Sequence, residues 1–169
     1  AGFRLPIESF PLQAMVSEPL KPCIDTVIMS GAVHVYISQS DKCELVVGAG
    51  SDNFVSYSQR GSFDMIDHII TPMVELFPFT SRLRMMRQWG GIVDVTVDRS
   101  PVITKTPVEN LMFNCGWGTG GFKCTPGSGN VFAHSLANGE LHPIAAPFTM
   151  ERFNSGALVD EGAAAAVAH

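Results

Sequence analysis

The segment Asn114-Cys-Gly-Trp-Gly-Thr-Gly-Gly-Phe-Lys-Cys-Thr-Pro-Gly-Ser-Gly129 holds six of the chain's 16 glycines, one tryptophan and a single cation, Lys123. Glycine has no Cβ, so its backbone N–H groups can approach a flat or phosphorylated ligand closely, and it accepts a positive φ. An apolar run at 111–115 precedes the segment, and a helix-like run at 131–137 follows it. A strand, a glycine loop and a helix in this order form cofactor sites in α/β proteins. We therefore expect 116–129 to be a binding loop, with Lys123 as the one fixed positive charge of a buried, otherwise uncharged pocket.

Gly116, Gly118 and Gly121 also match the G-x-G-x-x-G pattern of dinucleotide-binding folds. That pattern requires a helix opening on the last glycine and a second parallel strand ending in an acidic residue about 20 positions later. Pro126 is expected to delay the helix. The acidic residue at a suitable distance, Glu140, follows an Asn-Gly turn. An autonomous dinucleotide binder therefore remains only an alternative.

The composition is typical of a globular protein, and the sequence contains no cluster of basic residues. Its 169 residues carry a net charge of −5, and 46% of them are hydrophobic. Nucleic acid is not expected as a partner because Lys and Arg form no cluster, and no run of about 18 apolar residues predicts a membrane span. The cysteines form no Cys-x-x-Cys pair and the histidines show no ligand spacing, so we expect reduced thiols, a cytoplasmic location and no metal. The mean hydropathy of +0.19 indicates a large core or a surface that another chain covers.

Hydrophobic periodicity predicts many strands and few helices, which indicates an α+β fold with an antiparallel sheet and flanking helices. Runs at 33–38 and 43–48 flank turn-forming residues and predict a hairpin. Apolar residues at helical spacing predict a helix from the N-cap Ser62 to Phe77, kinked or split at Pro72. Gly90-Gly91 is expected to separate two strands. The strands are expected at 8–18, 26–29, 33–38, 43–48, 83–89, 92–97, 102–103 and 111–115.

Arg84 and Arg87 lie on the expected strand 83–89, where they could bind an anion. The alternative is a solvated strand edge on which they pair with Asp94 and Asp98 of the next strand, a contact worth little at a surface. The residue pattern leaves both interpretations open.

Two motifs together resemble the D-amino-acid-oxidase-like flavoenzymes, the group that contains sarcosine, glycine and dimethylglycine oxidases. The first motif is a Thr-x-Asp-x-x-Pro turn made of Thr96, Asp98 and Pro101. The second is the glycine loop ending in Gly121-Phe-Lys123. The resemblance extends over all 169 residues and is greatest to the β-subunit branch of the heterotetrameric sarcosine oxidases.

The resemblance implies that the chain is the C-terminal portion of an FAD-dependent enzyme, without the Rossmann half. Residues 1–90 would form the substrate-binding antiparallel sheet with its helices, 91–142 the returning part of the flavin-binding domain, and 143–169 a tail contacting another subunit. Lys123 would bind the substrate carboxylate. Arg84 and Arg87 would lie near the phosphate of an FMN attached in the absent part. The residues implied to face FAD are Gly116, Trp117, Gly118, Thr119, Gly120, Gly121, Phe122 and Lys123.

The implied reaction is the oxidation of sarcosine, an N-methyl amino acid, by hydride transfer to FAD, giving glycine and formaldehyde in a hetero-oligomer with other sarcosine oxidase subunits. Monomeric relatives carry a lysine linked to oxygen activation near the position of Val46, where this chain has no cation. This difference implies that electrons pass from FAD to FMN first. The alternative function is a non-catalytic fragment, a subunit-docking or ligand-binding module that cannot bind FAD by itself.

Overall fold

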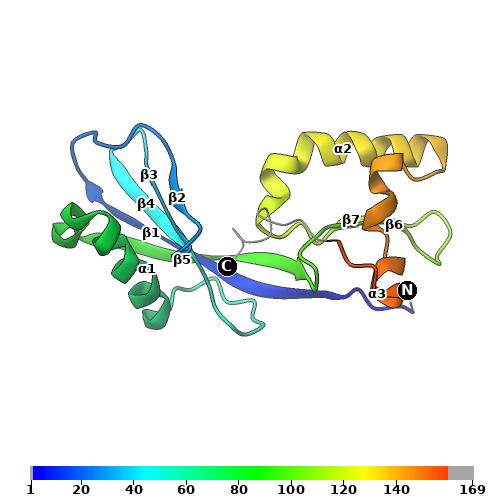
Figure 1. Ribbon diagram of the computed structural model, residues 1–169, viewed down its shortest axis with the longest axis horizontal. Helices are drawn as coiled ribbons and strands as arrows, with labels where there is room; N and C mark the ends of the chain where they lie inside the picture. The colour runs from blue at the N-terminus through cyan, green and yellow to red at the C-terminus, as the bar shows by residue number, and fades with distance from the viewer. Residues whose placement is uncertain (1, 160–169) are drawn as a thin grey trace. The chain divides into compact units, whose positions relative to one another are not determined.

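The computed structural model describes residues 2–159, which form two compact units (Figure 1). One unit consists of residues 9–93, and the other consists of residues 2–8 and 94–159. The segment before residue 9 thus belongs to the same unit as the glycine segment, although more than 80 residues separate them along the chain.

A five-stranded sheet has the strand order β2-β3-β4-β1-β5. The predicted hairpin is confirmed, since β3 and β4 pair antiparallel with Tyr36 opposite Gly48 and Ile37 opposite Val47. The β1–β4 and β2–β3 pairings are also antiparallel, as the α+β prediction requires. The strands are β1 (Ile7–Pro19), β2 (Ile28–Ser30), β3 (Val35–Gln39), β4 (Glu44–Ser51) and β5 (Met85–Thr96).

Helix α1 (Phe63–Leu76) packs its apolar face on this sheet and forms the core of the unit 9–93. Alternate residues of a strand point to the same face, so β3 and β4 each present a buried set to the helix. Pro72 does not split the helix, contrary to one of the two predicted outcomes; α1 runs to Leu76 before Pro78 opens the short helix η1 (Pro78–Arg82). The buried core residues are Met15, Val35, Ile37, Leu45, Val47, Met65, Ile69 and Met73.

A buried glutamine fixes the start of α1. The Gln13 side chain, which is 0% exposed, donates to Asp52 Oδ2 at 2.8 Å and accepts from the Ser62 N–H at 2.9 Å. Gln88 donates to the same Gln13 oxygen at 2.7 Å. Ser62 is the N-cap, as predicted, but its hydroxyl bonds to Asp52 and Gln13 and makes no cap bond to the helix. Tertiary contacts therefore replace the local cap.

The expected strand break at Gly90-Gly91 is wrong, because β5 continues through both glycines to Thr96. Gly90 is buried, and its N–H donates to the carbonyl of Gln59 at 3.0 Å. A Cβ at Gly90 would lie 3.4 Å from that backbone. The glycine thus lets a loop approach a strand closely, a known use of glycine within sheets.

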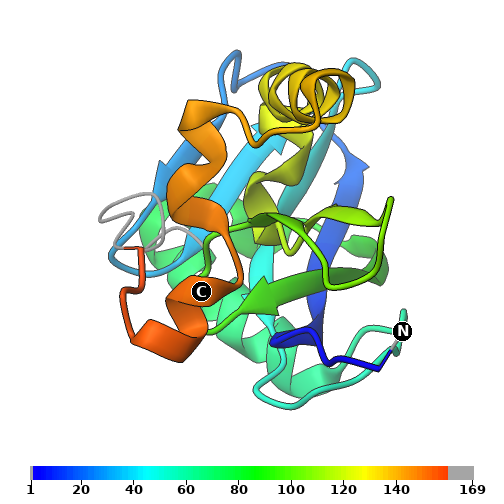
Figure 2. The ribbon, with the colours of Figure 1, turned by 90° about the vertical axis from the view of Figure 1, so that its right-hand side faces the viewer.

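In the second unit, β6 (Val102–Lys105) and β7 (Met112–Cys115) form an antiparallel pair at the expected strands 102–103 and 111–115. Figure 2 shows this unit with helix α2 (Gly121–Asn138), followed by η3 (Pro143–Phe148) and α3 (Glu151–Ser155). Its small core contains Ile103, Val131 and the fully buried Ala145. The expected tail from residue 143 is therefore helical and partly in this core, while residues 160–169 lie outside the described part.

The expectation of a loop over 116–129 is wrong for its second half, since α2 begins at Gly121 after the single turn η2 (Gly118–Gly120). Pro126 lies inside α2, where it removes one backbone donor, and Figure 1 shows α2 changing direction early in its course. A helix does open on the last glycine of the G-x-G-x-x-G pattern. No strand follows α2 between residues 139 and 159, so the dinucleotide fingerprint is incomplete in the described chain.

Truncation of Ile69 tests the core of the unit 9–93. Ile69 is 0% exposed on α1, so Ile69→Ala should lower the free energy of unfolding by about 2–5 kcal/mol. Leu76→Ala removes a similar side chain from the same helix at a position 47% exposed, and should cost less than about 1 kcal/mol. Denaturant unfolding monitored by circular dichroism measures both. Equal losses would contradict this packing.

Candidate functional site

The glycine segment 114–121 leaves β7 through two residues with positive φ, Gly116 at 69° and Gly118 at 53°. Trp117 between them has ordinary right-handed helical angles. Residues other than glycine rarely adopt such positive φ values, so the course of this turn depends on its glycines.

Gly116 is also required sterically. A Cβ at this position would lie 3.0 Å from Thr96 Cγ2 and 3.3 Å from Ile7 Cδ1, tighter than ordinary van der Waals contact. The buried Thr96 is the last residue of β5. The family-motif threonine and the first glycine of the segment thus pack directly against each other.

Trp117 anchors the segment to the core of its unit. Its indole N–H donates to Asn114 Oδ1 at 2.6 Å, and its ring packs against the cluster around Ile103, Val131 and Ala145. A Cβ at Gly121 would lie 3.2 Å from the Trp117 Cβ. Trp117 therefore contacts the segment both before the turn, at Asn114, and after it, at Gly121.

The outer side of the segment is open among the described residues. A Cβ at Gly120 would meet no atom within 4 Å, and Thr119 is exposed. Phe122 is 96% exposed. The expectation of a buried Lys123 is wrong for this part of the chain: the Lys123 side chain is exposed, and it makes no hydrogen bond or ion pair with residues 2–159. The tertiary contacts place it on the solvent-facing side of α2.

Lys123 nevertheless occupies an electrostatically unusual position in the first turn of α2. This turn contains no acidic residue, and its N-cap, Gly120, offers no side-chain acceptor. The N-terminus of a helix carries partial positive charge and favours anions. A lysine added there raises the positive potential further, so the first turn of α2 suits an anionic group.

Cys115, which precedes Gly116, is not a reactive thiolate. Its burial and the negative charge of Asp94 raise the pKa of the thiol above 9.0. The thiol therefore stays protonated at neutral pH, and thiolate is the form that acts as a nucleophile.

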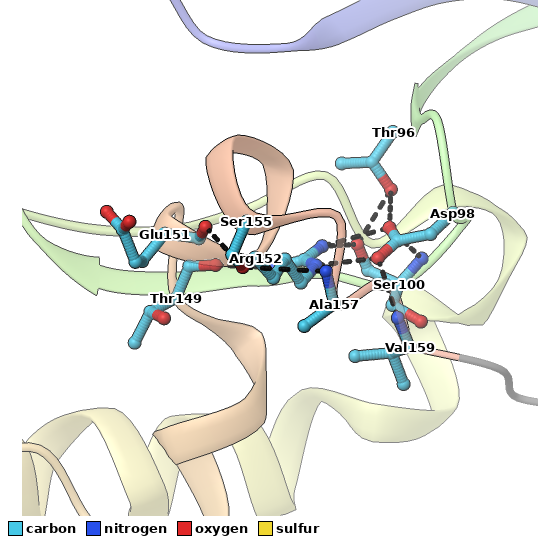
Figure 3. Close-up of polar contacts among 9 residues, drawn as sticks. All are labelled: Thr96, Asp98, Ser100, Thr149, Glu151, Arg152, Ser155, Ala157 and Val159. Carbon is cyan, nitrogen blue, oxygen red and sulfur yellow. Dashed lines mark hydrogen bonds and ion pairs between the residues drawn. The ribbon is translucent and has the colours of Figure 1, made fainter.

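The turn between β5 and β6 is held by a buried ion pair that the sequence did not predict (Figure 3). Arg152 of α3 donates through Nε to Asp98 Oδ2 at 2.6 Å and through Nη2 to Asp98 Oδ1 at 3.0 Å. The two side chains are 3% and 2% exposed. The suggested pairing of Asp98 with Arg84 or Arg87 is therefore wrong, because Arg152 lies 54 residues further along the chain and no local spacing connects it with Asp98.

This environment lowers the pKa of Asp98 from 3.8 to about 2. Burial alone would raise the pKa, but the hydrogen bonds and charge of Arg152 and the N–H groups of Val159 and Ser100 outweigh it. The ionised carboxylate is thus the stable form in the folded protein at all pH values above about 2.

Arg84 and Arg87 lie in the unit 9–93, at the start of β5, and both are exposed. The Arg84 N–H donates to Glu18 Oε1 at 3.0 Å, and the Arg87 guanidinium lies 5.2 Å from the centre of the Trp89 ring. Arg84 also borders a small, open and mainly apolar cavity of about 60 Å³ between β1, β4 and α1. Both cations are accessible to an anionic ligand.

Residues 2–159 contain neither a metal-binding cluster nor a helix that could span a membrane. No group of three or more histidine, cysteine, aspartate or glutamate side chains there is placed to hold a metal ion. None of the helices in that range has the length and apolar character needed to cross a bilayer.

The family model for FAD-dependent oxidoreductases matches residues 1–135, most of the chain. The chain belongs to this family. The predicted family resemblance is confirmed, and membership of this family implies a flavin cofactor, FAD.

Three curated relatives of this flavoenzyme chain are named sarcosine oxidase subunit beta. The proteins from an Arthrobacter species and from Rhodobacter capsulatus are 57% and 58% identical over the whole chain. The Rhizobium meliloti protein is 52% identical over 95% of the chain. The chain spans 42%, 41% and 39% of their lengths, about two-fifths in each case.

Solved structures show the same fold in other members of the family. The L-proline dehydrogenase of P. horikoshii aligns with 94% of this chain at a TM-score of 0.85 and 22% identity, covering 43% of that protein. Glycine oxidase from Geobacillus kaustophilus aligns with 88% of the chain at a TM-score of 0.77 and 20% identity, covering 40% of that protein.

The glycine segment fits one side of a flavin site. The positive φ at Gly118 and the open space beside Gly120 let a planar group approach the backbone without meeting a side chain. No side chain among residues 2–159 fills that space. The open backbone of residues 116–121 is therefore compatible with a planar cofactor.

The lowered pKa of Asp98 predicts a specific acid sensitivity. A carboxylate whose folded pKa is depressed contributes stability that is complete above its unfolded pKa of 3.8 and is lost as the pH falls towards 2. The shift corresponds to about 2 kcal/mol. The stability difference between wild type and Asp98→Asn should therefore shrink by about this amount between roughly pH 5 and pH 2.

Denaturant unfolding across this pH range measures the difference. Asp41→Asn, at an exposed aspartate in the turn between β3 and β4, is the matched control and should show no comparable trend. A constant difference between wild type and Asp98→Asn would contradict the assignment.

Proposed function

We propose that this chain is part of a flavin-dependent oxidoreductase that oxidises sarcosine or a closely related N-methyl amino acid to glycine and formaldehyde. The relatives named sarcosine oxidase subunit beta, at 52–58% identity, support the substrate class. The local observation that carries the proposal is Lys123 in an acid-free helix turn directly after the glycine segment. An amino-acid carboxylate is the anion that such a site beside a flavin would hold.

In this proposal Lys123 and the N-terminus of α2 bind the substrate carboxylate, and the glycine segment 116–121 lies against the flavin. Fixing the carboxylate orients the N-methyl carbon for reaction and removes the entropic cost of finding that geometry. A flavin held against this segment would supply the redox chemistry, the uptake from the substrate of two electrons and a proton, formally a hydride. The oxidised amine product then hydrolyses to formaldehyde and glycine.

Two further residues acquire a role in the same proposal. Phe122 is 96% exposed in this chain. In the proposal it is covered by the substrate or by another part of the enzyme, and it excludes water from the reacting carbon. Val46 on β4 offers no cation for oxygen activation, which supports electron transfer from FAD to a second flavin. We propose FMN as that flavin, in a hetero-oligomeric cytoplasmic enzyme whose other subunits complete the site.

Replacement of Lys123 tests the carboxylate role. Lys123→Met in the full enzyme should raise KM for sarcosine roughly 10- to 100-fold, since a charge-assisted hydrogen bond contributes about 1.5–3 kcal/mol. Lys123→Arg keeps the charge and should lose less. Lys42→Met, which removes an exposed lysine from the turn between β3 and β4, is the matched control and should leave KM unchanged. Steady-state kinetics decide, and an unaltered KM in Lys123→Met would remove Lys123 from the site.

The flavin itself is tested by visible absorption of the purified protein. A yellow protein, or one that becomes yellow with added FAD, supports the enzyme. A colourless protein that takes up no flavin supports a docking or ligand-binding module. The incomplete dinucleotide fingerprint of residues 2–159 is consistent with such a module.

Arg84 and Arg87 are proposed to contact the FMN phosphate. The double variant Arg84→Gln/Arg87→Gln should retain less FMN in the assembled enzyme, with FMN affinity about tenfold lower or more because phosphate–arginine pairs are strong. Arg82→Gln removes an exposed arginine from the neighbouring η1 and serves as control. Flavin extraction with separation of FAD and FMN gives the ratio, and equal FMN content in all three proteins would exclude the contact.

A further inference from the structure

The Arg152 guanidinium makes hydrogen bonds both to the turn between β5 and β6 and to the backbone just before α3. Besides its two bonds to Asp98, Nη2 donates to the Ser100 carbonyl at 2.8 Å and Nη1 donates to the Thr149 carbonyl at 3.2 Å. The guanidinium carbon also lies 4.1 Å from the centre of the Phe153 ring. Arg152 thus links α3 to the turn between β5 and β6 (Figure 3).

Asp98 passes this constraint to Thr96. Thr96 Oγ1 lies 3.1 Å from Asp98 Oδ1 and 2.7 Å from the Ser100 carbonyl, and is placed to donate to either. Because threonine is β-branched, a hydrogen bond from Oγ1 fixes χ1 and therefore also fixes the direction of the Cγ2 methyl.

The Thr96 methyl is the group that lies against Gly116. It is 3.0 Å from the position that a Gly116 Cβ would take, so it limits where the first glycine of the segment can lie. All residues in this series of contacts, from Arg152 through Asp98 and Thr96 to Gly116, belong to one compact unit.

We propose that Arg152 is a positioning residue for the flavin-facing glycine segment, acting through Asp98 and the Thr96 rotamer. Arg152 touches neither substrate nor cofactor in this proposal. Its role rests on the proposed function only in that residues 116–123 form the flavin site. The positioning itself is a property of this chain without any ligand.

A buried ion pair is often only structural, and removing one partner destabilises because the other charge stays buried. The test must therefore separate local displacement of the glycine segment from general loss of stability. Thr96→Ser provides this separation, since it keeps the hydroxyl for Asp98 and removes only the methyl that contacts Gly116.

The experiment compares amide hydrogen exchange of wild type, Arg152→Lys, Thr96→Ser and Arg99→Gln without flavin. Arg99 is an exposed residue of the same turn, so Arg99→Gln is a matched loss of charge outside the contact series. We expect Arg152→Lys and Thr96→Ser to speed exchange at residues 114–120 while residues 131–138 of α2 keep wild-type protection. Uniform acceleration across the unit, or no change in Thr96→Ser, would overturn the proposal.

A second readout is the dissociation constant for FAD in the full enzyme. Arg152→Lys and Thr96→Ser should each weaken FAD binding about 3- to 30-fold, the range expected for coupling through packed neighbours. The effects of the two changes in the double variant should be less than additive, because Arg152→Lys frees the Thr96 methyl and Thr96→Ser removes the same group. Additive effects would overturn the proposed route through Thr96.

The two readouts distinguish the failure of each idea. If wild type binds no FAD, the proposed function fails, and the exchange data still decide whether Arg152 positions the segment. If Arg152→Lys does not fold, the exchange data of Thr96→Ser alone decide the proposal, because the Arg152–Asp98 ion pair is unchanged in that variant.

Discussion

One buried carboxylate, that of Asp98, joins the parts of the unit that carries the glycine segment. It accepts hydrogen bonds from the Arg152 guanidinium and from the N–H groups of Ser100 and Val159, and Thr96 Oγ1 lies within reach. An ionised carboxylate is stable at 2% exposure only because these donors replace the water it has lost. The shape of the turn after β5 and the position of the segment around Val159 both depend on this charge.

The same interaction connects the family motif with the candidate site. Asp98 belongs to the Thr-x-Asp-x-x-Pro turn, and the Thr96 methyl beside it lies against Gly116. The glycine segment consequently packs against Thr96 on one side and is anchored by the Trp117 ring on the other, while its outer side near Gly120 is open. A preorganised surface of this kind suits a reaction in which the cofactor does the redox chemistry and the protein supplies orientation.

Local pattern was sufficient for part of this arrangement. The alternation at 33–38 and 43–48 predicted the β3–β4 hairpin, and helical spacing after Ser62 predicted α1, because periodicity reports directly which face is buried. Two predictions that rested on glycine and proline are wrong. The pattern predicts a strand break at Gly90, although this glycine admits a neighbouring loop to β5. It also predicts that Pro126 delays a helix, although α2 starts at Gly121 and includes Pro126. Both effects depend on neighbours that are distant in sequence or on the course of the whole helix.

Contiguous residues are sufficient to predict the family, the antiparallel hairpin, the first long helix and the location of the glycine segment with Lys123. Only the tertiary structure decided that Lys123 is exposed, that Gly116 packs on Thr96, and that Arg152 neutralises Asp98. The physical reason is separation along the chain. A charge pair 54 residues apart leaves no periodic or compositional trace, and it forms only after folding has removed water from both groups.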